Sequence, residues 1–301
     1  MGVRGKYIWM DGKFIPWKKA NIHFVTHTFH YSGGAFEGIR FYKTAKGIAV
    51  FRLKEHLKRL FYSANCIGIK PHFSQHQITE AIKKLIIKNK LGTGYIRPLI
   101  YYGYGKMGVD PRGAPMNIAI GAWPWKDYLG SSAAHAYISS FMRIHPKSTF
   151  MDTKICGNYA NSILAGLEAR NKGYTEAILL DFKGHIAEGP GENVFMVKKG
   201  ILITPQKGTI LPGITRDSVL KLAKDHGIKT KERTVTVKDF LNADEAFFTG
   251  TATEIEAMVK VNGQKIGNGK IGPVTARLKQ SYAKAVRGKN PKYLTWLTFV
   301  S

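Results

Sequence analysis

The spacing of apolar residues changes period several times along the chain, and this change constrains the fold more than any other feature. Strand-like runs at 7–10 and 13–15 flank Asp11-Gly12, a dipeptide typical of a hairpin turn. Further strands are expected at 36–42, 48–51, 95–102 and 118–125, whereas 53–64 and 78–86 carry apolar residues at helical spacing. The strands and helices do not alternate strictly, so the pattern predicts an α+β fold with many hairpins and not a Rossmann fold.

The second half of the chain repeats this mixture after a polar, small-residue segment. Residues 127–134 (Asp-Tyr-Leu-Gly-Ser-Ser-Ala-Ala) predict a linker. Strands are expected at 137–141, 176–181, 192–197, 201–204 and 246–248, and helices from near Asn158, Thr215 and Val274. With 301 residues, we expect a small N-terminal domain at 1–126 and a large C-terminal domain at 135–301.

The charge balance admits a nucleic-acid-binding protein as one alternative. Lys and Arg number 46 and Asp and Glu number 20, which gives a formal net charge of +26. The basic residues are spread over the whole chain, and no block of five or six like charges occurs. We therefore favour a general surface bias over a polyanion-binding function.

Features that are missing from the sequence indicate the cellular compartment of the protein. Only Cys66 and Cys156 occur, which is too few for a disulfide framework and fits a reducing, cytoplasmic compartment. No apolar run approaches the roughly 18 residues of a membrane helix, and the first residues lack the apolar core of a secretory signal. We expect a cytoplasmic protein that does not bind membranes.

Three glycine-rich loops in the second half are candidate binding sites. Glu188-Gly-Pro-Gly-Glu192-Asn193 places two carboxylates together, which indicates either a cationic partner or a tight hairpin with solvated acids. Leu211-Pro-Gly-Ile-Thr-Arg216 opens a helix, whose free N–H groups suit a phosphate unless Thr215 is a plain N-cap. Thr249-Gly-Thr-Ala-Thr-Glu254 either forms a backbone nest for an anion or ends a Thr-rich strand. Together the loops predict a small ligand with several charges.

Lys154 precedes the helix that starts near Asn158. A buried lysine in that place would suit Schiff-base chemistry, but composition does not single it out among so many lysines. The phosphate-binding motif G-x-x-x-x-G-K-[ST] is absent.

These segments together resemble the class IV (fold type IV) pyridoxal-phosphate aminotransferases. The string Lys154-x-x-Gly157-Asn158-Tyr159-x-Asn161-Ser162 precedes the three loops in the family's order. In the first half, three strings resemble the branched-chain amino acid aminotransferases specifically: Phe36-Glu37-Gly38-Ile39-Arg40, Glu55-His56-Leu57-x-Arg59-Leu60 and Tyr95-Ile96-Arg97-Pro98. The resemblance runs from about Trp9 to Leu297 and implies the two-domain, D-amino acid aminotransferase-like architecture of fold type IV.

The resemblance implies pyridoxal 5'-phosphate as the cofactor and no metal. Lys154 would be the catalytic residue and would form the Schiff base with the cofactor. Glu188 would pair with the ring nitrogen, Tyr159 would bond the ring oxygen, and Leu211 would pack on one ring face. The phosphate would be bound by Arg59, Ile214, Thr215 and Thr251.

The resemblance also implies transfer of the amino group of Leu, Ile or Val to 2-oxoglutarate with ping-pong kinetics. Arg97 would meet the distal carboxylate of glutamate, and Gly38 would leave room for the substrate side chain. The α-carboxylate would lie on the N–H groups of Thr251 and Ala252. The full substrate-binding set implied is Tyr31, Phe36, Gly38, Tyr95, Arg97, Tyr128, Thr251 and Ala252.

Two relatives of the same fold, D-amino acid aminotransferase and aminodeoxychorismate lyase, share the lysine, the glutamate and the phosphate loop, but the first-half strings disfavour both. The expected partners are small molecules (branched-chain amino acids, glutamate and 2-oxo acids) and a second copy of the chain in a homodimer or dimer-based oligomer. Cys156 either packs under the cofactor or is a core residue, and we favour the core.

Overall fold

The computed structural model describes residues 4–125 and 133–300, and the contacts divide the chain into two compact units. Unit 1 comprises Met1–Lys126, Thr153–Gly157 and Ala285–Ser301, and unit 2 comprises Asp127–Asp152 and Asn158–Lys284. Of the linker expected at 127–134, all but the last two residues lie outside the described residues. The short segment after 152 and the C-terminal segment belong to unit 1, although the expected second domain at 135–301 included both.

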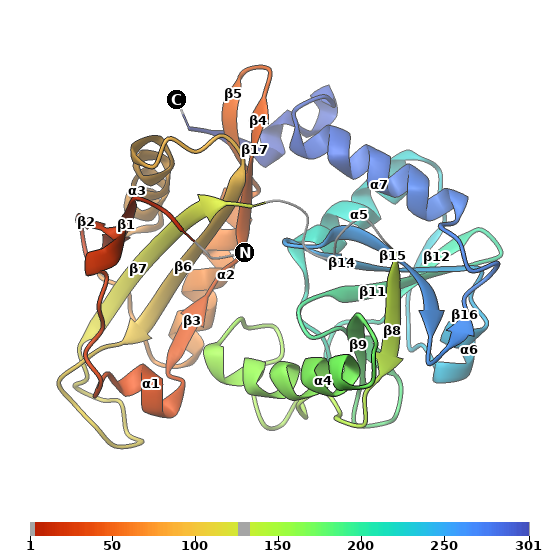
Figure 1. The fold of residues 1–301 in the computed structure, drawn as a ribbon, viewed down its shortest axis with the longest axis horizontal. Coiled ribbons are helices and arrows are strands. Elements are labelled where there is room, and N and C mark those ends of the chain that lie inside the picture. Colours follow the sequence, from red (N-terminus) through yellow and green to blue (C-terminus); the bar gives the residue numbers. More distant parts are fainter. Residues whose placement is uncertain (1–3, 126–132, 301) are drawn as a thin grey trace. The chain divides into compact units, whose positions relative to one another are not determined.

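Unit 1 is built on one antiparallel sheet (Figure 1). Within the described residues the strand order is β17-β5-β4-β6-β7-β1-β2, with β3 also paired to β6. The strands are β1 (Tyr7–Met10), β2 (Lys13–Pro16), β3 (Gly34–Phe36), β4 (Ile39–Thr44), β5 (Gly47–Phe51), β6 (Gly94–Tyr102), β7 (Met116–Pro124) and β17 (Leu297–Phe299). The helices are α1 (His27–Tyr31), α2 (Leu53–Cys66) and α3 (Gln75–Lys88), with 3-10 turns at Trp17–Lys19 and Pro291–Trp296.

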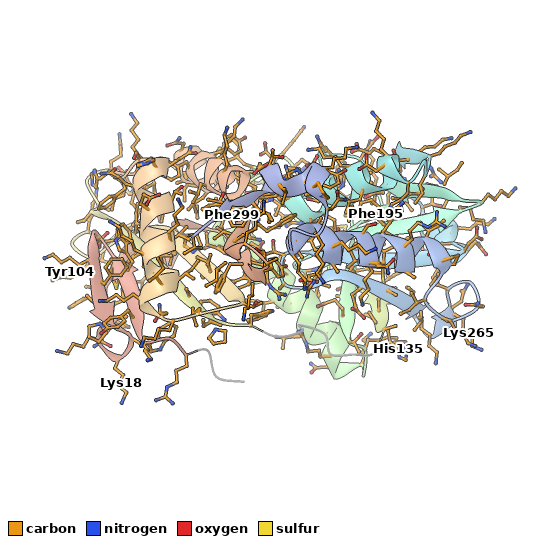
Figure 2. All side chains as sticks on the ribbon, turned by 90° about the horizontal axis from the view of Figure 1, so that it is seen from above. Lys18, Tyr104, His135, Phe195, Lys265 and Phe299 are labelled. Carbon is orange, nitrogen blue, oxygen red and sulfur yellow. The ribbon has the colours of Figure 1, made fainter. Side chains whose placement is uncertain are left out.

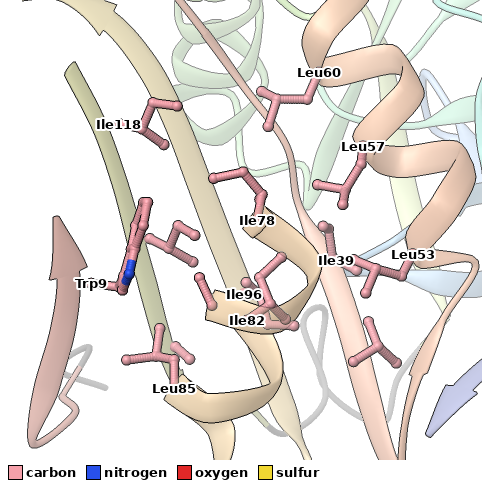
Figure 3. Packing of buried hydrophobic residues seen from close by; sticks show 14 of the residues in the cluster. Trp9, Ile39, Leu53, Leu57, Leu60, Ile78, Ile82, Leu85, Ile96 and Ile118 are labelled. Atoms are coloured by element: carbon pink, nitrogen blue, oxygen red, sulfur yellow. The ribbon is translucent and has the colours of Figure 1, made fainter. Parts of the chain in front are cut away.

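Helices α2 and α3 pack on this sheet through the apolar residues whose spacing predicted them. Figure 3 shows Leu57 of α2 and Ile82 of α3 directed toward Ile39, Ile96 and Ile118 of the strands. All five side chains are buried, and each contributes roughly 1.5–3 kcal/mol to folding. The two predicted helices and the hairpin at Asp11-Gly12 are confirmed.

The strand expected at 36–42 is interrupted in the structure. β3 ends at Phe36 and β4 begins at Ile39, so Glu37 and Gly38 lie outside both strands. Both flanking strands still pair with β6. The Glu37 side chain is buried and hydrogen-bonds with His56 and Arg59 of α2.

The C-terminal strand β17 explains why the last residues belong to unit 1. Leu297, Thr298 and Phe299 pair antiparallel with Phe51, Val50 and Ala49 of β5. A strand of this length has no periodicity to detect, and its partner is far away in the sequence, so the sequence pattern did not place it.

Unit 2 contains a second sheet, in the order β10-β9-β8-β15-β14-β11-β12-β13 within the described residues. Because β10 also pairs with β11, the first six strands of this order close into a ring. The strands are β8 (Ala134–Ile138), β9 (Glu176–Leu180), β10 (Ile186–Glu188), β11 (Asn193–Lys198), β12 (Ile201–Thr204), β13 (Thr230–Glu232), β14 (Glu245–Gly250), β15 (Glu254–Val261) and β16 (Gln264–Lys265). The helices are α4 (Tyr159–Asn171), α5 (Ile214–Asp225), α6 (Val237–Leu241) and α7 (Pro273–Val286), with a 3-10 turn at Cys156–Asn158.

Helix α4 packs through its small residues. Ala165 and Ala169 are fully buried against Ala177 and Leu179 of β9. Ile163, Leu164 and Leu167 are exposed, Ile163 to 60%. Small side chains let the helix approach the strand closely, which leaves an apolar row on its outer side.

The positive charge is spread over the surface of both units. Figure 2 shows nitrogen-tipped side chains around the margins of each unit, including Lys18 and Lys265. Among the described residues, every helix is too short or too polar to span a bilayer.

Candidate active site

Residues predicted to bind the cofactor and substrate occur in both units. In unit 1, hydrogen bonds to its backbone hold Lys154 in place. Its N–H donates to Ser63 Oγ at 2.9 Å, and its carbonyl oxygen accepts from the N–H of Phe36 at 3.0 Å. Its Nζ lies 4.9 Å from the centre of the Phe36 ring. A segment without regular structure is thereby fixed beside β3.

Helix α2 carries a polar row beside its apolar stripe. His56, Arg59 and Ser63 are three and four residues apart, so they share one face of the helix. Arg59 donates from Nε to Glu37 Oε1 at 2.6 Å and from Nη2 to Glu37 Oε2 at 3.0 Å. His56 Nδ1 lies 2.7 Å from Glu37 Oε2. Glu37, which is 0% exposed, is therefore bonded by two side chains of one helix.

The charges in this group are set by burial and by the short contacts. Burial alone would raise the pKa of Glu37, but Arg59 and His56 hold that pKa well below its usual range. Burial lowers the pKa of His56 despite the opposing effect of Glu37. At neutral pH the imidazole is therefore uncharged and donates its Nδ1–H to the carboxylate. The buried Glu37–Arg59 pair then has no net charge.

Arg97 lies beside the aromatic residues expected to line the substrate site. Its Nη2 donates to Tyr95 Oη at 3.0 Å, and its Cζ lies 4.8 Å from the centre of the Phe36 ring. A Cβ at Gly38 would come within 1.9 Å of Tyr95 Oη. The absent side chain of Gly38 thus makes room for Tyr95, and the room it would leave for the substrate stays a prediction.

Cys156 is half-buried two residues after Lys154. Burial raises the pKa of its thiol to about 11, so the thiol is protonated at neutral pH. A protonated, partly buried thiol is a poor nucleophile. Its Sγ lies 3.2 Å from the position of a Cβ at Gly34, so it packs under β3.

In unit 2, Glu188 is a buried carboxylate surrounded by donors. Its Oε1 accepts from Arg143 Nε at 2.6 Å, and its Oε2 accepts from Asn193 Nδ2 at 3.1 Å and from the Leu211 N–H at 3.0 Å. Glu192 is also buried and accepts from Thr253 Oγ1 at 3.1 Å. The loop is the turn of a hairpin, because β10 and β11 pair antiparallel at Glu188 and Asn193. Its two acids are buried, so the expectation that they are solvated is wrong.

The second loop forms a cradle at the start of α5. Gly213 occupies the N-cap position and makes no side-chain cap, so the alternative of Thr215 as the N-cap is wrong. Thr215 lies in the first turn, where backbone N–H groups have no partner within the helix. A Cβ at Gly213 would come within 2.0 Å of Asn193 Oδ1. The N-terminus of α5 suits an anion such as a phosphate.

The third loop joins β14 to β15, where Gly250 pairs with Glu254. It therefore forms the turn of a hairpin, and Thr251 and Ala252 lie half-buried at its tip. Within the described residues, the buried Oγ1 of Thr249 at its start has no hydrogen-bond partner. A polar atom of this kind suits a site that binds a polar ligand.

The structure gathers most of the predicted residues within each unit. Unit 1 brings together Phe36, Gly38, Arg59, Tyr95, Arg97 and Lys154, and unit 2 brings together Glu188, Leu211, Ile214 and Thr215. Tyr159 is the first residue of α4, and Tyr31 lies on α1 and is 40% exposed. Tyr128 lies outside the described residues.

Four residues of these groups were not predicted. Glu37 and His56 lie within the family strings, and the spacing of His56, Arg59 and Ser63 along α2 is the signal that places them on one face. Arg143 gave no signal, because it lies in an irregular segment 45 residues before its partner Glu188.

The residues present fit pyridoxal phosphate. The group needs a lysine, an anion cradle and a carboxylate for its ring nitrogen. Taken unit by unit, the lysine and an arginine (Lys154 and Arg59) occur in unit 1. The helix start at Gly213 and the buried carboxylate of Glu188 occur in unit 2.

Comparisons with known proteins point the same way. The family model of class IV aminotransferases matches residues 34–260. The branched-chain-amino-acid aminotransferase of Pseudomonas aeruginosa is 42% identical, over 100% of this chain and 99% of that protein. The crystal structure of the Escherichia coli branched-chain amino acid aminotransferase matches with a TM-score of 0.96 and 41% identity, over 99% of this chain and 100% of that chain. A further branched-chain amino acid aminotransferase, solved as a complex with N-(5'-phosphopyridoxyl)-L-glutamate, matches with a TM-score of 0.96, 40% identity and 100% coverage of both chains.

The buried state of His56 predicts a loss of stability in mild acid. Its folded pKa is lowered, so protons bind the unfolded chain more readily once the pH falls below the ordinary histidine pKa of about 6.5. The stabilisation is complete above that pH and declines below it. Between pH 7.5 and 5.5 we expect His56→Gln to remove on the order of 1 kcal/mol of the decline in unfolding free energy. His76→Gln, at an exposed position of α3, should leave the decline unchanged. Urea unfolding at each pH measures the free energy of unfolding. An equal decline with pH in the wild type and both variants would contradict the assignment.

Proposed function

The chain belongs to the branched-chain amino acid aminotransferases of the class IV family, and on that basis we propose that it transfers the amino group of Leu, Ile or Val to 2-oxoglutarate. It is a transaminase that depends on pyridoxal phosphate. The observation that carries the proposal is Glu188, a carboxylate kept out of water and bonded by Arg143, Asn193 and the Leu211 N–H.

When bound, pyridoxal phosphate supplies an electron sink for the negative charge that develops at the amino acid Cα. We assign to Glu188 the task of holding a proton at the ring nitrogen. Three donors support this role, because they fix the carboxylate in one orientation and favour its charged form. We assign Leu211, whose N–H bonds Glu188, to one face of the ring, and Tyr159 to the ring oxygen.

Lys154 is the residue that we assign to cofactor attachment and to moving the proton at the substrate Cα. Ser63 and Phe36 bond its backbone on both sides, so proton movement requires motion of the side chain alone. The phosphate is assigned to the first N–H groups of α5 at Ile214 and Thr215, with Thr251 and Arg59.

The two substrates of a ping-pong cycle differ in their side chains. Arg97 supports binding of the acidic side chain, because an exposed guanidinium held by Tyr95 can bind a distal carboxylate bidentately. Phe36 lies against Arg97 and supports binding of the aliphatic side chain. We place the α-carboxylate on the N–H groups of Thr251 and Ala252, and we keep Tyr31, Gly38 and Tyr128 as proposed members of the substrate set.

We further propose a homodimer and a cytoplasmic place in branched-chain amino acid metabolism. The outer row of α4 supports the dimer, because Ile163, Leu164 and Leu167 are exposed. Phe141 and Met142 add to this apolar surface, since the Met142 carbonyl bonds Asn161 of the same helix. The two free cysteines support a reducing compartment.

Lys154→Ala tests the proposed function directly. Turnover of leucine with 2-oxoglutarate should fall by roughly 10²–10⁴-fold or more, because proton transfer loses its amine. Lys58→Ala, which removes an exposed lysine of α2, should retain full activity. Formation of the 2-oxo acid is the measurement, and substantial turnover by the purified Lys154 variant would refute the assignment.

Arg97→Ala should damage the two half-reactions unequally. The glutamate half should lose on the order of 2–4 kcal/mol of transition-state binding, and the leucine half less than about 1 kcal/mol, since leucine has no distal charge. Arg112→Ala, at an exposed arginine paired with Asp110, is the control. Single-turnover rates with each amino acid measure the two half-reactions. Equal losses of rate in both would show that Arg97 only supports the local structure.

The dimer predicts a mass in sedimentation of twice the 33.6 kDa of one chain. Leu164→Asp with Leu167→Asp should shift the protein toward the monomer, because charges are costly in an apolar interface. Ile271→Asp, at another exposed apolar position of unit 2, should leave the mass unchanged. A wild-type monomer would exclude the proposal.

A further inference from the structure

Glu37 is a fully buried carboxylate to which the proposed chemistry assigns no task. Burying an ion pair such as Glu37–Arg59 is a poor way to gain stability, because desolvation offsets much of the attraction. An apolar pair of similar size often serves a core equally well. The retained charge therefore calls for an explanation other than stability.

The geometry of the pair fixes the orientation of Arg59. Glu37 accepts from Nε and Nη2, which lie on one edge of the guanidinium. Two parallel bonds set the plane of the group and the direction of its other edge. The Arg59 side chain is 12% exposed, so the group is held while still reachable from solvent.

The carboxylate is itself held in place. His56 donates to Oε2 at 2.7 Å, and the N–H of Gly38 lies 3.3 Å from the same oxygen. His56 and Arg59 are on consecutive positions of the polar row of α2, so a rigid helix holds both partners. The Arg59 side chain is thus already ordered before any ligand binds.

The same frame holds Lys154. Ser63, the next member of the polar row, accepts the Lys154 N–H, and Phe36, adjacent to Glu37 in sequence, donates to the Lys154 carbonyl. In pyridoxal phosphate, the phosphate and the carbon that a lysine attacks are a fixed number of bonds apart. A protein that binds both must keep its arginine and its lysine at a matching separation.

We propose that Glu37 is a positioning residue: it orients Arg59 for the cofactor phosphate, and His56 holds Glu37 for that purpose. The inference rests on the proposed function through Arg59. Preorganisation of this kind raises affinity because the ligand does not have to order a long side chain when it binds.

The test compares the apoprotein's affinity for pyridoxal phosphate with its affinity for pyridoxal, which lacks the phosphate. Glu37→Gln should weaken binding of pyridoxal phosphate on the order of ten- to a hundredfold and change binding of pyridoxal less than about threefold. Glu55→Gln is the matched control, because Glu55 also pairs with an arginine of the same region, Arg52. It should change neither affinity. Equal losses for both ligands in Glu37→Gln would overturn the proposal.

Arg59→Ala completes a double-mutant cycle. In the Arg59→Ala background, Glu37→Gln should weaken pyridoxal phosphate no further, whereas additive losses would overturn the proposal. If Arg59→Ala alone leaves the ratio of the two affinities unchanged, Arg59 does not bind the phosphate, and the inference fails with that assignment. Failure of the wild type to bind pyridoxal phosphate would instead contradict the proposed function itself.

His56→Gln provides a second variant in case Glu37→Gln does not fold. It leaves the Glu37–Arg59 pair intact and changes only the group that holds it. It should weaken pyridoxal phosphate severalfold and spare pyridoxal. An equal effect on both ligands, or none on either, would overturn the role given to His56 and Glu37.

Discussion

A carboxylate removed from water must be surrounded by donors, and this constraint shapes the candidate site in both units. Glu37 in unit 1 has Arg59 and His56, and Glu188 in unit 2 has Arg143, Asn193 and a backbone N–H. Each set fixes a charged side chain before any ligand binds. In so basic a chain these acids are few, and both are placed where we assign binding of a charged cofactor.

Apolar packing forms the scaffold around these groups. Helix α2 shows most clearly how apolar and polar residues divide these tasks. Its apolar stripe anchors it on the sheet, and its polar row holds Glu37 and the backbone of Lys154. One helix therefore supplies both stability and site geometry. In unit 2 the start of α5 plays a similar part, because Gly213 permits close contact with Asn193, which in turn bonds Glu188.

Local patterns predicted much of this fold, and long-range contacts account for what they missed. Apolar spacing located α2 and α3, and the turn residues located the first hairpin, because each depends on neighbours in sequence. β17 was missed because its partner is remote. The resemblance supplied the site residues, but it could not show that Gly38 accommodates Tyr95 or that Arg143 supports Glu188, since both depend on tertiary contacts.

The central claim is that Lys154 is the lysine that attaches pyridoxal phosphate. Borohydride reduces the bond between the cofactor and its lysine, so the cofactor stays on the residue that carried it. Peptide mass mapping of the reduced holoprotein should find one phosphopyridoxyl group per chain, on the peptide that contains Lys154. A phosphopyridoxyl group on a different lysine, or none after reduction, would contradict the account.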